Sequence, residues 1–364
     1  MLFVVTVGNG SMDTYAYKLA EKIDVPVVCT DIYQQLRQSR NISWLSPRAM
    51  KTIWHNRCLV RMLNKLGDSV HLPNHHLGRY GNSLSVPYII TVHDLIRYFD
   101  MDGDDTFIHS PNRRDRYYLN LDFEGIRKAM RVIAVSQSTK DDLMNCLDIP
   151  DERISVVYEG IDHNVFRPVS QRIYNHPYIL FVGTEHPRKN FTTLLKAFSQ
   201  LKSEPRFKEL KLVKVGSAGG QETDFRSETM GVAESLNLSS EVIFTDFVPE
   251  TDLPTYYSGA DVFVLPSLYE GFGFPVLEAM ACACPVVTSD TSSLPEVVGK
   301  AGIMVDPQNT DSLAQAISKV LTDSKLRDNM IRKGLEQAKG FSWEKAAEQT
   351  LEVYRKVENR QVRR

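Results

Sequence analysis

Two stretches in the second half of the chain carry residues whose types and spacing suit the binding of a phosphate and a sugar. In the first stretch, Gly183 follows an apolar run and precedes Arg188 and Lys189, with Asn190 placed to cap a helix that begins at Phe191. A glycine allows close approach of the backbone. Two cations beside a helix N-terminus form an anion site, because arginine can bind a diphosphate bidentately and lysine acts as a point charge. Taken alone, the same stretch could also be a solvated basic turn.

The second stretch places two glutamates around a turn that contains Gly271 and Gly273. The turn follows an apolar run and precedes a helical pattern, so its backbone N–H groups are exposed toward a phosphate or sugar oxygen. Glu270 lies before the turn and Glu278 lies after it. One carboxylate can then bind the hydroxyls of a sugar while the other binds the hydroxyls of a ribose. A pair of surface glutamates would share this spacing, but the strand before the turn and the helix after it favour a binding site.

The elements that must position these residues alternate short β-branched runs with helical or loop stretches, first in one half of the chain and then in the other. The runs expected as strands are Leu2–Val7, Val25–Cys29, Tyr88–Val92 and Arg131–Val135, followed by Tyr178–Val182, Leu210–Val215, Val242–Phe244, Val262–Leu265 and Val286–Thr288. This alternation predicts an α/β fold with parallel sheets. The polar stretch 166–177 divides the halves. We therefore expect two Rossmann-like domains, residues 1–170 and 171–342, with a ligand in the cleft at the strand ends.

The composition is that of an ordinary globular protein. The 364 residues are 42% hydrophobic and 24% charged with a formal net charge of −2, so nothing indicates a nucleic-acid partner. Five scattered cysteines argue against a disulfide framework and for a reducing compartment, and we expect Cys282 and Cys284 to be buried thiols. No stretch approaches the roughly 18 consecutive apolar residues of a membrane span, and the first residues do not begin as a signal peptide does. These features predict a cytoplasmic protein.

Several motifs together resemble one family. Residues 266–288 are similar to the region of two glutamates separated by seven residues in the retaining glycosyltransferases of family 4, which have the GT-B fold. The stretch 183–190 resembles that family's diphosphate loop. Residues 91–94 look like the strand end of its acceptor domain, and residues 157–168 look like its interdomain junction. The resemblance covers most of the chain. It implies two Rossmann-like domains that face each other across a cleft, with a last helix at 343–364 that packs back on the first domain.

The resemblance also implies a role for each matching residue. Arg188 and Lys189 would neutralise the diphosphate and the charge that grows on the leaving group. Glu270 would contact the transferred sugar, and Glu278 would hold the ribose. His93 would face the sugar from the acceptor domain. The remaining contacts with the nucleotide-sugar would come from Gly10, Gly183, Val248, Leu253, Phe272, Gly273, Phe274, Val276 and Leu277.

The implied reaction is the transfer of a mannosyl, glucosyl or N-acetylglucosaminyl group from a UDP- or GDP-sugar to a hydroxyl of a sugar or lipid-linked acceptor, with retention of the anomeric configuration. The resemblance implies no conventional general base and no cofactor. No metal is expected, because side chains supply the cations. The acidic stretch Asp100–Asp105 contains an Asp-x-Asp and begins like a calcium loop. However, Asp105 occupies the position that needs glycine and Pro111 the position that needs glutamate, so we expect a solvated loop.

Two other classes of protein are considered. Gly8 and Gly10 open a near-match to a dinucleotide fingerprint, and Asp31 lies near the distance of its ribose acid, which would suit a nicotinamide-dependent oxidoreductase. Asp13 occupies the third glycine position and lacks the small surface that close helix–strand packing needs there. The second alternative is a non-catalytic protein that binds a nucleotide-sugar without transferring the sugar.

A basic segment in the first half indicates a possible surface for membrane contact. On a helix from Pro47 to Leu66, Arg57, Arg61 and Lys65 would share one face, with Trp54 among them. The opposite, core-facing side would consist of Ala49, Ile53, Val60 and Leu63. Interleaved cations and aromatic residues suit an anionic membrane surface, whereas a charged solvated face is the alternative. The protein could therefore be peripheral on the inner face of a membrane.

Overall fold

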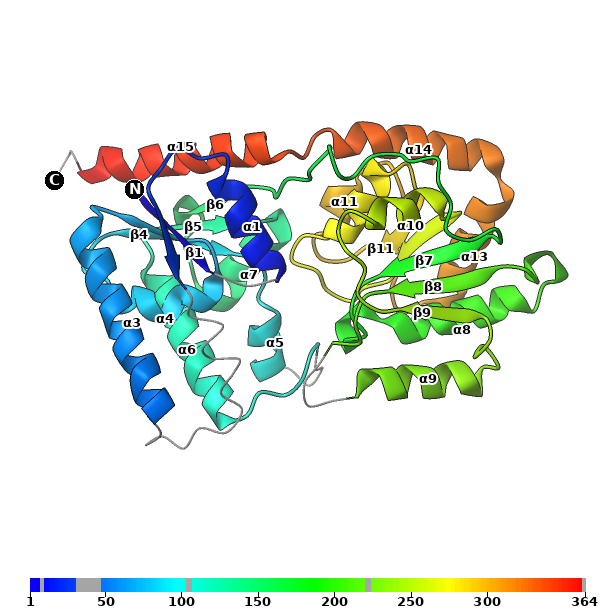
Figure 1. Cartoon of the computed structure of the whole chain (residues 1–364), viewed down its shortest axis with the longest axis horizontal. Helices are drawn as coiled ribbons and strands as arrows, with labels where there is room; N and C mark the ends of the chain where they lie inside the picture. Colours follow the sequence, from blue (N-terminus) through cyan, green and yellow to red (C-terminus); the bar gives the residue numbers. More distant parts are fainter. Residues whose placement is uncertain (7–9, 31–46, 103–106, 220–223, 362–364) are drawn as a thin grey trace. The chain divides into compact units, whose positions relative to one another are not determined.

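Each half of the chain folds around its own parallel sheet in the computed structural model, which describes residues 1–6, 10–30, 47–102, 107–219 and 224–361 (Figure 1). Unit 1 comprises Met1–Tyr98, Pro111–Gly160 and Trp343–Arg364, and unit 2 comprises Phe99–Ser110 and Ile161–Ser342. The chain thus changes unit at Gly160, earlier than the expected boundary after residue 170. Residues 99–110, expected in the N-terminal domain, belong instead to unit 2.

The sheet of unit 1 has six parallel strands in the order β2-β1-β3-β4-β5-β6. Their bounds are β1 Leu2–Thr6, β2 Val27–Thr30, β3 Val70–Leu72, β4 Tyr88–Val92, β5 Arg131–Ala134 and β6 Ile154–Val156. Side chains on both faces of the central strands are buried, as expected where helices cover a parallel sheet. The sequence did not predict β3 and β6, because runs of three residues show no periodicity.

The described helices of unit 1 range from three residues in the shortest to 20 residues in the longest. They are α1 Ser11–Ala20, α3 Pro47–Leu66, η1 His75–Leu77, α4 Gly78–Gly81, α5 Ile96–Asp102, α6 Arg113–Lys128, α7 Gln137–Leu147, η2 Asp151–Arg153 and α15 Trp343–Gln361, and α5 runs on into unit 2. The backbones of α4 and α6 approach so closely that a Cβ on Gly125 would lie 1.8 Å from the carbonyl oxygen of Gly78. Helix α15 is joined to the sheet by the Tyr354 hydroxyl, which lies 2.7 Å from His71 Nδ1.

Helix α3 has the predicted bounds, Pro47–Leu66. Arg57, Arg61 and Lys65 are exposed and Leu63 is buried, as the helical pattern predicts. Val60 is only half-buried. Leu59 is buried instead, because Leu59 and Leu63, four positions apart, lie on the same core-facing side of the helix. The side chains of residues 47–56, Trp54 included, lie outside the described part. Among the residues that are described, no helix is long and apolar enough to cross a membrane.

The sheet of unit 2 also has six parallel strands, in the order β12-β11-β10-β7-β8-β9. The strands are β7 Tyr178–Val182, β8 Lys211–Val215, β9 Val242–Thr245, β10 Val262–Leu265, β11 Val286–Ser289 and β12 Ile303–Val305. The helices are η3 Pro187–Lys189, α8 Phe191–Lys202, η4 Pro205–Phe207, α9 Phe225–Ser235, α10 Leu253–Gly259, α11 Phe274–Ala281, α12 Leu294–Val298, α13 Thr310–Thr322 and α14 Ser324–Ala338. Helices α8 and α9 lie on one face of the sheet, and α10 and α11 lie on the other (Figure 1). Cys282 and Cys284 are buried, as predicted.

The topology of unit 2 brings the two chemically promising loops together. β10 pairs with β7 in parallel, with Phe263 opposite Leu180. Parallel neighbours end at the same edge of a sheet, so the loop after β7 and the loop after β10 leave the sheet side by side. Arg188 and Lys189 lie in the first loop, and Glu270 lies in the second.

Candidate functional site: a buried charge cluster in unit 2

Glu270 is the centre of a charge cluster at the carboxyl ends of β7 and β10. Lys189 Nζ donates to Glu270 Oε1 at 2.6 Å, and Arg188 Nη1 donates to Glu270 Oε2 at 2.8 Å. The Ser267 hydroxyl donates to Oε1 at 2.7 Å. Glu270 and Lys189 are each only 6% exposed. Arg188, Lys189 and Glu270, which the sequence placed in two separate loops, therefore form one network.

The two cationic partners of Glu270 favour the ionised form of its carboxyl group. Burial would raise the pKa of Glu270, but the charges of Lys189 and Arg188 outweigh it and lower that pKa to about 2. Burial lowers the pKa of Lys189, and the charge of Glu270 opposes this. Two cations and one anion leave a net charge of +1 (2 − 1) in a buried place. Such a cluster attracts an anion, and removing either member of a buried pair is strongly destabilising.

Asn190 connects this cluster to its surroundings in an unexpected way. It precedes α8 in the left-handed region with φ of 54°, and its side chain makes no capping hydrogen bond, contrary to the prediction. Its Nδ2 donates instead to the carbonyl oxygens of Pro266 at 3.0 Å and Pro307 at 2.7 Å, and it accepts from the Thr193 hydroxyl. Asparagine tolerates this backbone conformation, which turns the side chain toward the loops after β10 and β12.

Phe99 and Phe107 pack beside the same cluster. The N–H of Arg188 donates to the carbonyl oxygen of Phe107 at 3.1 Å, and the rings of Phe99 and Phe107 lie 5.4 and 5.7 Å from the ring of Tyr269. Asp100, expected in a solvated acidic loop, is 3% exposed and accepts from the N–H of Phe107 at 2.7 Å. Residues 103–106 lie outside the described part. No group of three or more His, Cys, Asp or Glu side chains that could hold a metal occurs among the described residues.

Glu278 lies on α11, beyond the glycine turn, and is partly buried. The Tyr257 hydroxyl donates to Glu278 Oε2 at 2.6 Å, and burial raises the pKa of this carboxyl to about 7. The turn itself needs glycine at position 273, where φ is 111° and a Cβ would lie 2.9 Å from Leu294 Cδ2. The Ser293 hydroxyl fixes the turn by hydrogen bonds to the carbonyl oxygens of Glu270 and Phe272.

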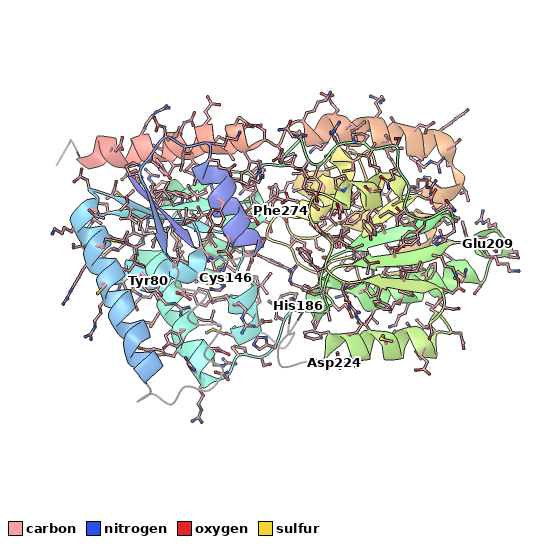
Figure 2. The ribbon with its side chains drawn as sticks, viewed as in Figure 1. Tyr80, Cys146, His186, Glu209, Asp224 and Phe274 are labelled. Atoms are coloured by element: carbon pink, nitrogen blue, oxygen red, sulfur yellow. The ribbon has the colours of Figure 1, made fainter. Side chains whose placement is uncertain are left out.

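The other residues of unit 2 that were predicted to contact the nucleotide-sugar lie along the same edge of the sheet. Gly183 directly follows β7. Phe274, labelled in Figure 2, begins α11. Val276 and Leu277 have buried side chains, and their N–H groups already donate to the carbonyl oxygen of Gly273 at 3.0 and 3.4 Å. These bonds complete the first turn of α11, and the contact of Val276 and Leu277 with the nucleotide-sugar stays a prediction. The last of these residues are the buried Phe272 and the half-buried Val248 and Leu253.

In unit 1, both ring nitrogens of His93 are engaged. Nδ1 lies 2.8 Å from Glu159 Oε1, and Nε2 lies 2.9 Å from the carbonyl oxygen of Pro73. Both partners can accept a hydrogen bond, so this arrangement favours the doubly protonated ring. Burial lowers the pKa of His93, but the hydrogen bond and charge of Glu159 outweigh it and raise the pKa above its ordinary value.

Gly10 and Asp13, which belong to the near-match to a dinucleotide fingerprint, bond to each other in the structure. The N–H of Gly10 donates to Asp13 Oδ2 at 3.0 Å, so the Asp13 side chain satisfies the N–H of the residue that precedes α1. A fingerprint glycine would keep such an N–H for a pyrophosphate. This argues against a nicotinamide site. Residues 7–9 and Asp31 lie outside the described part.

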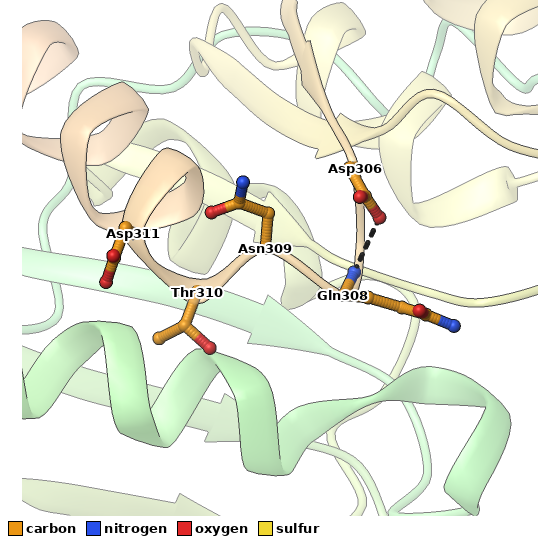
Figure 3. A pocket seen from close by; sticks show the side chains of 5 residues that line it. All are labelled: Asp306, Gln308, Asn309, Thr310 and Asp311. Carbon is orange, nitrogen blue, oxygen red and sulfur yellow. Dashed lines mark hydrogen bonds between the residues drawn. The ribbon is translucent and has the colours of Figure 1, made fainter.

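A hollow of about 370 Å³ lies between β12 and α13, lined by Asp306, Gln308, Asn309, Thr310 and Asp311 (Figure 3). Polar side chains that line it accept hydrogen bonds from backbone N–H groups of the same chain. Asp306 accepts from the N–H of Gln308, and Asn309 accepts from the N–H of Ser312 and caps α13. Two carboxylates and no cation line it, so it does not suit a diphosphate.

Sequence reasoning missed the residues that hold the cluster in place. Ser267, Tyr257, Ser293 and Phe107 were not singled out, and of these only Ser267 lies close to Glu270 in the sequence. A serine three residues before a functional glutamate is a signal that could have been used. Ser293 lies in the stretch 292–296, which also fits the family resemblance, but nothing local in the sequence marks Tyr257 or Phe107.

Comparisons with known proteins agree with this geometry. Residues 163–337 match the family model described as glycosyl transferases group 1, and residues 12–165 match that described as glycosyltransferase family 4. The chain is 34% identical over 256 residues to the O-antigen chain mannosyltransferase B of Escherichia coli, covering 68% of this chain and 66% of that one. It is 32% identical over 289 residues to the serotype-specific mannosyltransferase WbdA of the same organism, covering 75% and 34%. The match thus spans about two thirds of the first relative and about a third of the second.

Solved structures share the fold at lower sequence identity. Sucrose-phosphate synthase from Thermosynechococcus elongatus superposes with a TM-score of 0.78 at 23% identity, covering 98% of this chain and 99% of that one. Anabaena HepE in complex with UDP-glucose gives a TM-score of 0.78 at 18% identity with the same coverage.

Proposed function

This chain belongs to the family 4 glycosyltransferases of the GT-B fold, and we propose that it transfers a hexosyl group from a nucleotide-diphosphate sugar to the hydroxyl of a sugar or lipid-linked acceptor. The observation that carries the proposal is the cluster of Arg188, Lys189 and Glu270, which offers a net positive, buried site at the end of β7. Mannosyl, glucosyl and N-acetylglucosaminyl donors all fit the site. The mannosyltransferases among the relatives favour a mannosyl group.

In the proposed mechanism, Arg188 and Lys189 bind the diphosphate and stabilise the charge that grows on it as the glycosidic bond to the sugar breaks. Their charges act in a place largely closed to water, where electrostatic stabilisation is strongest. Glu270 contacts the hydroxyls of the transferred sugar, and Glu278 binds the ribose. The sugar keeps its anomeric configuration, because the acceptor hydroxyl attacks from the face that the phosphate leaves and gives its proton to that phosphate.

We propose that the reaction needs neither a metal ion nor a cofactor. What supports this is the chemistry of the site, since two cationic side chains stand where a divalent metal would otherwise neutralise the diphosphate. Asp100, the buried carboxylate of the acidic stretch, is used by backbone N–H groups.

We also propose that the acceptor is reached at an anionic membrane surface on the cytoplasmic side. The support is the exposed basic face of α3, formed by Arg57, Arg61 and Lys65, and Trp54 lies on the same helix. Lysine and arginine each contribute on the order of 1 kcal/mol near anionic lipids.

The test of donor binding is a thermal-shift panel of UDP, GDP and their sugar conjugates. A ligand present at roughly 100 times its Kd stabilises the folded state by about 2.7 kcal/mol. We expect one nucleotide and its sugar conjugate to raise the melting temperature, followed by release of the nucleoside diphosphate when a sugar acceptor is added. If no nucleotide shifts the transition, the proposal fails. Binding without release would indicate a non-catalytic nucleotide-sugar protein.

A further inference from the structure

Four buried polar atoms without a hydrogen-bond partner gather in one loop of the described chain. They are Thr184 Oγ1, Glu185 Oε2, His186 Nδ1 and Arg188 Nε. All four lie within residues 184–188, which run from the end of β7 into η3. Buried polar atoms are almost always paired, because leaving one unpaired is costly. A loop with so many of them is a place where a ligand supplies the missing partners.

Glu185 is the most tightly held of these residues, and its carboxyl group is fully buried. Oε1 accepts from Lys214 Nζ at 2.8 Å and from Arg226 Nε at 2.8 Å, while Oε2 has no partner. Lys214, also fully buried, gives its other protons to the carbonyl oxygens of Gly216 and Ser217 at 2.6 and 2.9 Å. All three Lys214 donors are therefore used. The two cations fix the carboxylate and leave one oxygen as an acceptor.

This carboxylate lies on the β8 side of the diphosphate cluster. The N–H of Glu185 donates to the carbonyl oxygen of Ala218 in the loop after β8, and Arg226 also bonds Asp246 after β9. The ring of His186 packs 5.4 Å from the ring of Phe225 at the start of α9, close to Asp224 in Figure 2. The strand order is β10-β7-β8-β9. Glu270 follows β10 and therefore lies on one side of the loop after β7, whereas Glu185 lies toward β8 on the other side.

A nucleotide-sugar that places its sugar at Glu270 and its diphosphate at Arg188 and Lys189 would extend its nucleoside toward β8 and β9. Phe247, 82% exposed just after β9, is an apolar surface on that path. A nucleobase offers N–H donors along its edge, at N3 in uracil and at N1 and N2 in guanine. A fixed carboxylate oxygen without a partner is the complement of such a donor.

We propose that Glu185 recognises the nucleobase of the donor, with Oε2 accepting a hydrogen bond from a base N–H while Lys214 and Arg226 hold the carboxylate in place. This inference rests on the proposed nucleotide-sugar donor. It assigns to Glu185 a part in selecting the nucleotide, separate from the diphosphate and ribose contacts.

The first test uses the wild-type protein and nucleotides that lack the N–H. Titration calorimetry compares UDP with N3-methyl-UDP, GDP with N1-methyl-inosine diphosphate, which lacks both the N1 and the N2 donors of guanine, and both parents with ribose 5-diphosphate. For the nucleotide that binds better, we expect methylation to weaken binding by about 10-fold or more, the loss typical of a hydrogen bond to a charged group. Equal affinity of the methylated and parent nucleotides would show that only water occupies Oε2 and would overturn the inference.

The second test replaces the carboxylate without leaving a buried cation. Glu185→Met alone would strand Lys214, so the variant is Glu185→Met with Lys214→Met. We expect it to bind the parent nucleotide as weakly as the methylated one, with an unchanged affinity for ribose 5-diphosphate. The matched control is Glu241→Met with Lys202→Met and Lys211→Met, which removes a carboxylate near the opposite ends of β8 and β9 together with both lysines that pair with it. It should keep the wild-type preference.

The outcomes separate this inference from the proposed function. If the wild-type protein binds no nucleotide at all, the proposed function fails and the inference fails with it. If nucleotides bind but the double variant still discriminates against the methylated base, the inference alone is wrong. Should the double variant not fold, as judged by circular dichroism, the methylated nucleotides on the wild-type protein still decide the question.

Discussion

Glu278 offers a prediction in which stability and nucleotide binding respond to the same carboxyl group. Burial raises the pKa of this group to about 7 in the folded protein, against an ordinary value of 4.5, although Tyr257 donates a hydrogen bond to it. The folded state therefore holds the proton more tightly than the unfolded state does. Stability from this group is fully present below the ordinary pKa, and it is lost as the pH rises through about 7.

The size of the effect follows from the two pKa values. A difference from 4.5 to about 7, at about 1.36 kcal/mol for each pH unit, amounts to at most about 3 kcal/mol, and partial exposure of Glu278 makes this an upper bound. Glu278→Gln cannot ionise and keeps an oxygen for the Tyr257 hydroxyl. We expect this variant to be more stable than the wild type by up to about 3 kcal/mol near pH 8, and by less than about 1 kcal/mol near pH 5.

Urea unfolding followed by circular dichroism at the two pH values measures this difference. A gain of this size would raise the melting temperature of a domain of about 200 residues by roughly 6 to 12 °C. Glu241→Gln is the control of opposite sign, because Lys202 and Lys211 outweigh burial and lower the pKa of Glu241. It should lose stability at neutral pH. A Glu278→Gln protein that is less stable than the wild type near pH 8 would refute the reasoning.

Three further predictions address the proposed reaction. Glu278→Ala should weaken nucleotide binding itself, whereas Glu270→Gln should lower kcat, because a sugar contact can tighten as the transition state forms, and should also destabilise the donor-free protein, because Arg188 and Lys189 lose their anion; equal nucleotide affinity in wild type and Glu278→Ala would contradict this. Activity should survive EDTA, and loss of activity that manganese restores would contradict the metal-independent mechanism. Replacing Arg57, Arg61 and Lys65 with glutamine should weaken binding to anionic vesicles at low salt by about 3 kcal/mol in total, with little change in stability. Unfolding of that variant would show that the face is buried.

The parts of the site that could be predicted are those that a parallel sheet dictates. The apolar runs Tyr178–Val182 and Val262–Leu265 form β7 and β10 with the expected bounds. Strands of this kind end at one edge, so the chemistry-bearing loops after them had to meet. The meeting of Arg188 and Lys189 with Glu270 follows from that rule, although their direct pairing does not.

The parts that could not be predicted depend on contacts between residues far apart in the sequence. Tyr257 reaches Glu278, and Phe107 reaches the backbone of Arg188 from a segment that the sequence assigns to the other half of the chain. Such contacts leave no periodic pattern in the sequence from which they could be predicted. The left-handed backbone conformation of Asn190 could not be predicted either, because asparagine is favoured both as a helix cap and in that conformation.

The pairing of Glu270 with both cations gives a physical reason for how the proposed site is prepared for its donor. A buried lysine and arginine would not remain ordered and charged without an anion, and Glu270 supplies that anion while the site holds no ligand. An incoming diphosphate competes for the same two cations and takes over part of this role. The carboxylate then becomes available to the hydroxyls of the transferred sugar, so neither Arg188 nor Lys189 is left unpaired before or after binding. The cations need little reorganisation when charge develops on the leaving group, which is the condition for strong electrostatic stabilisation.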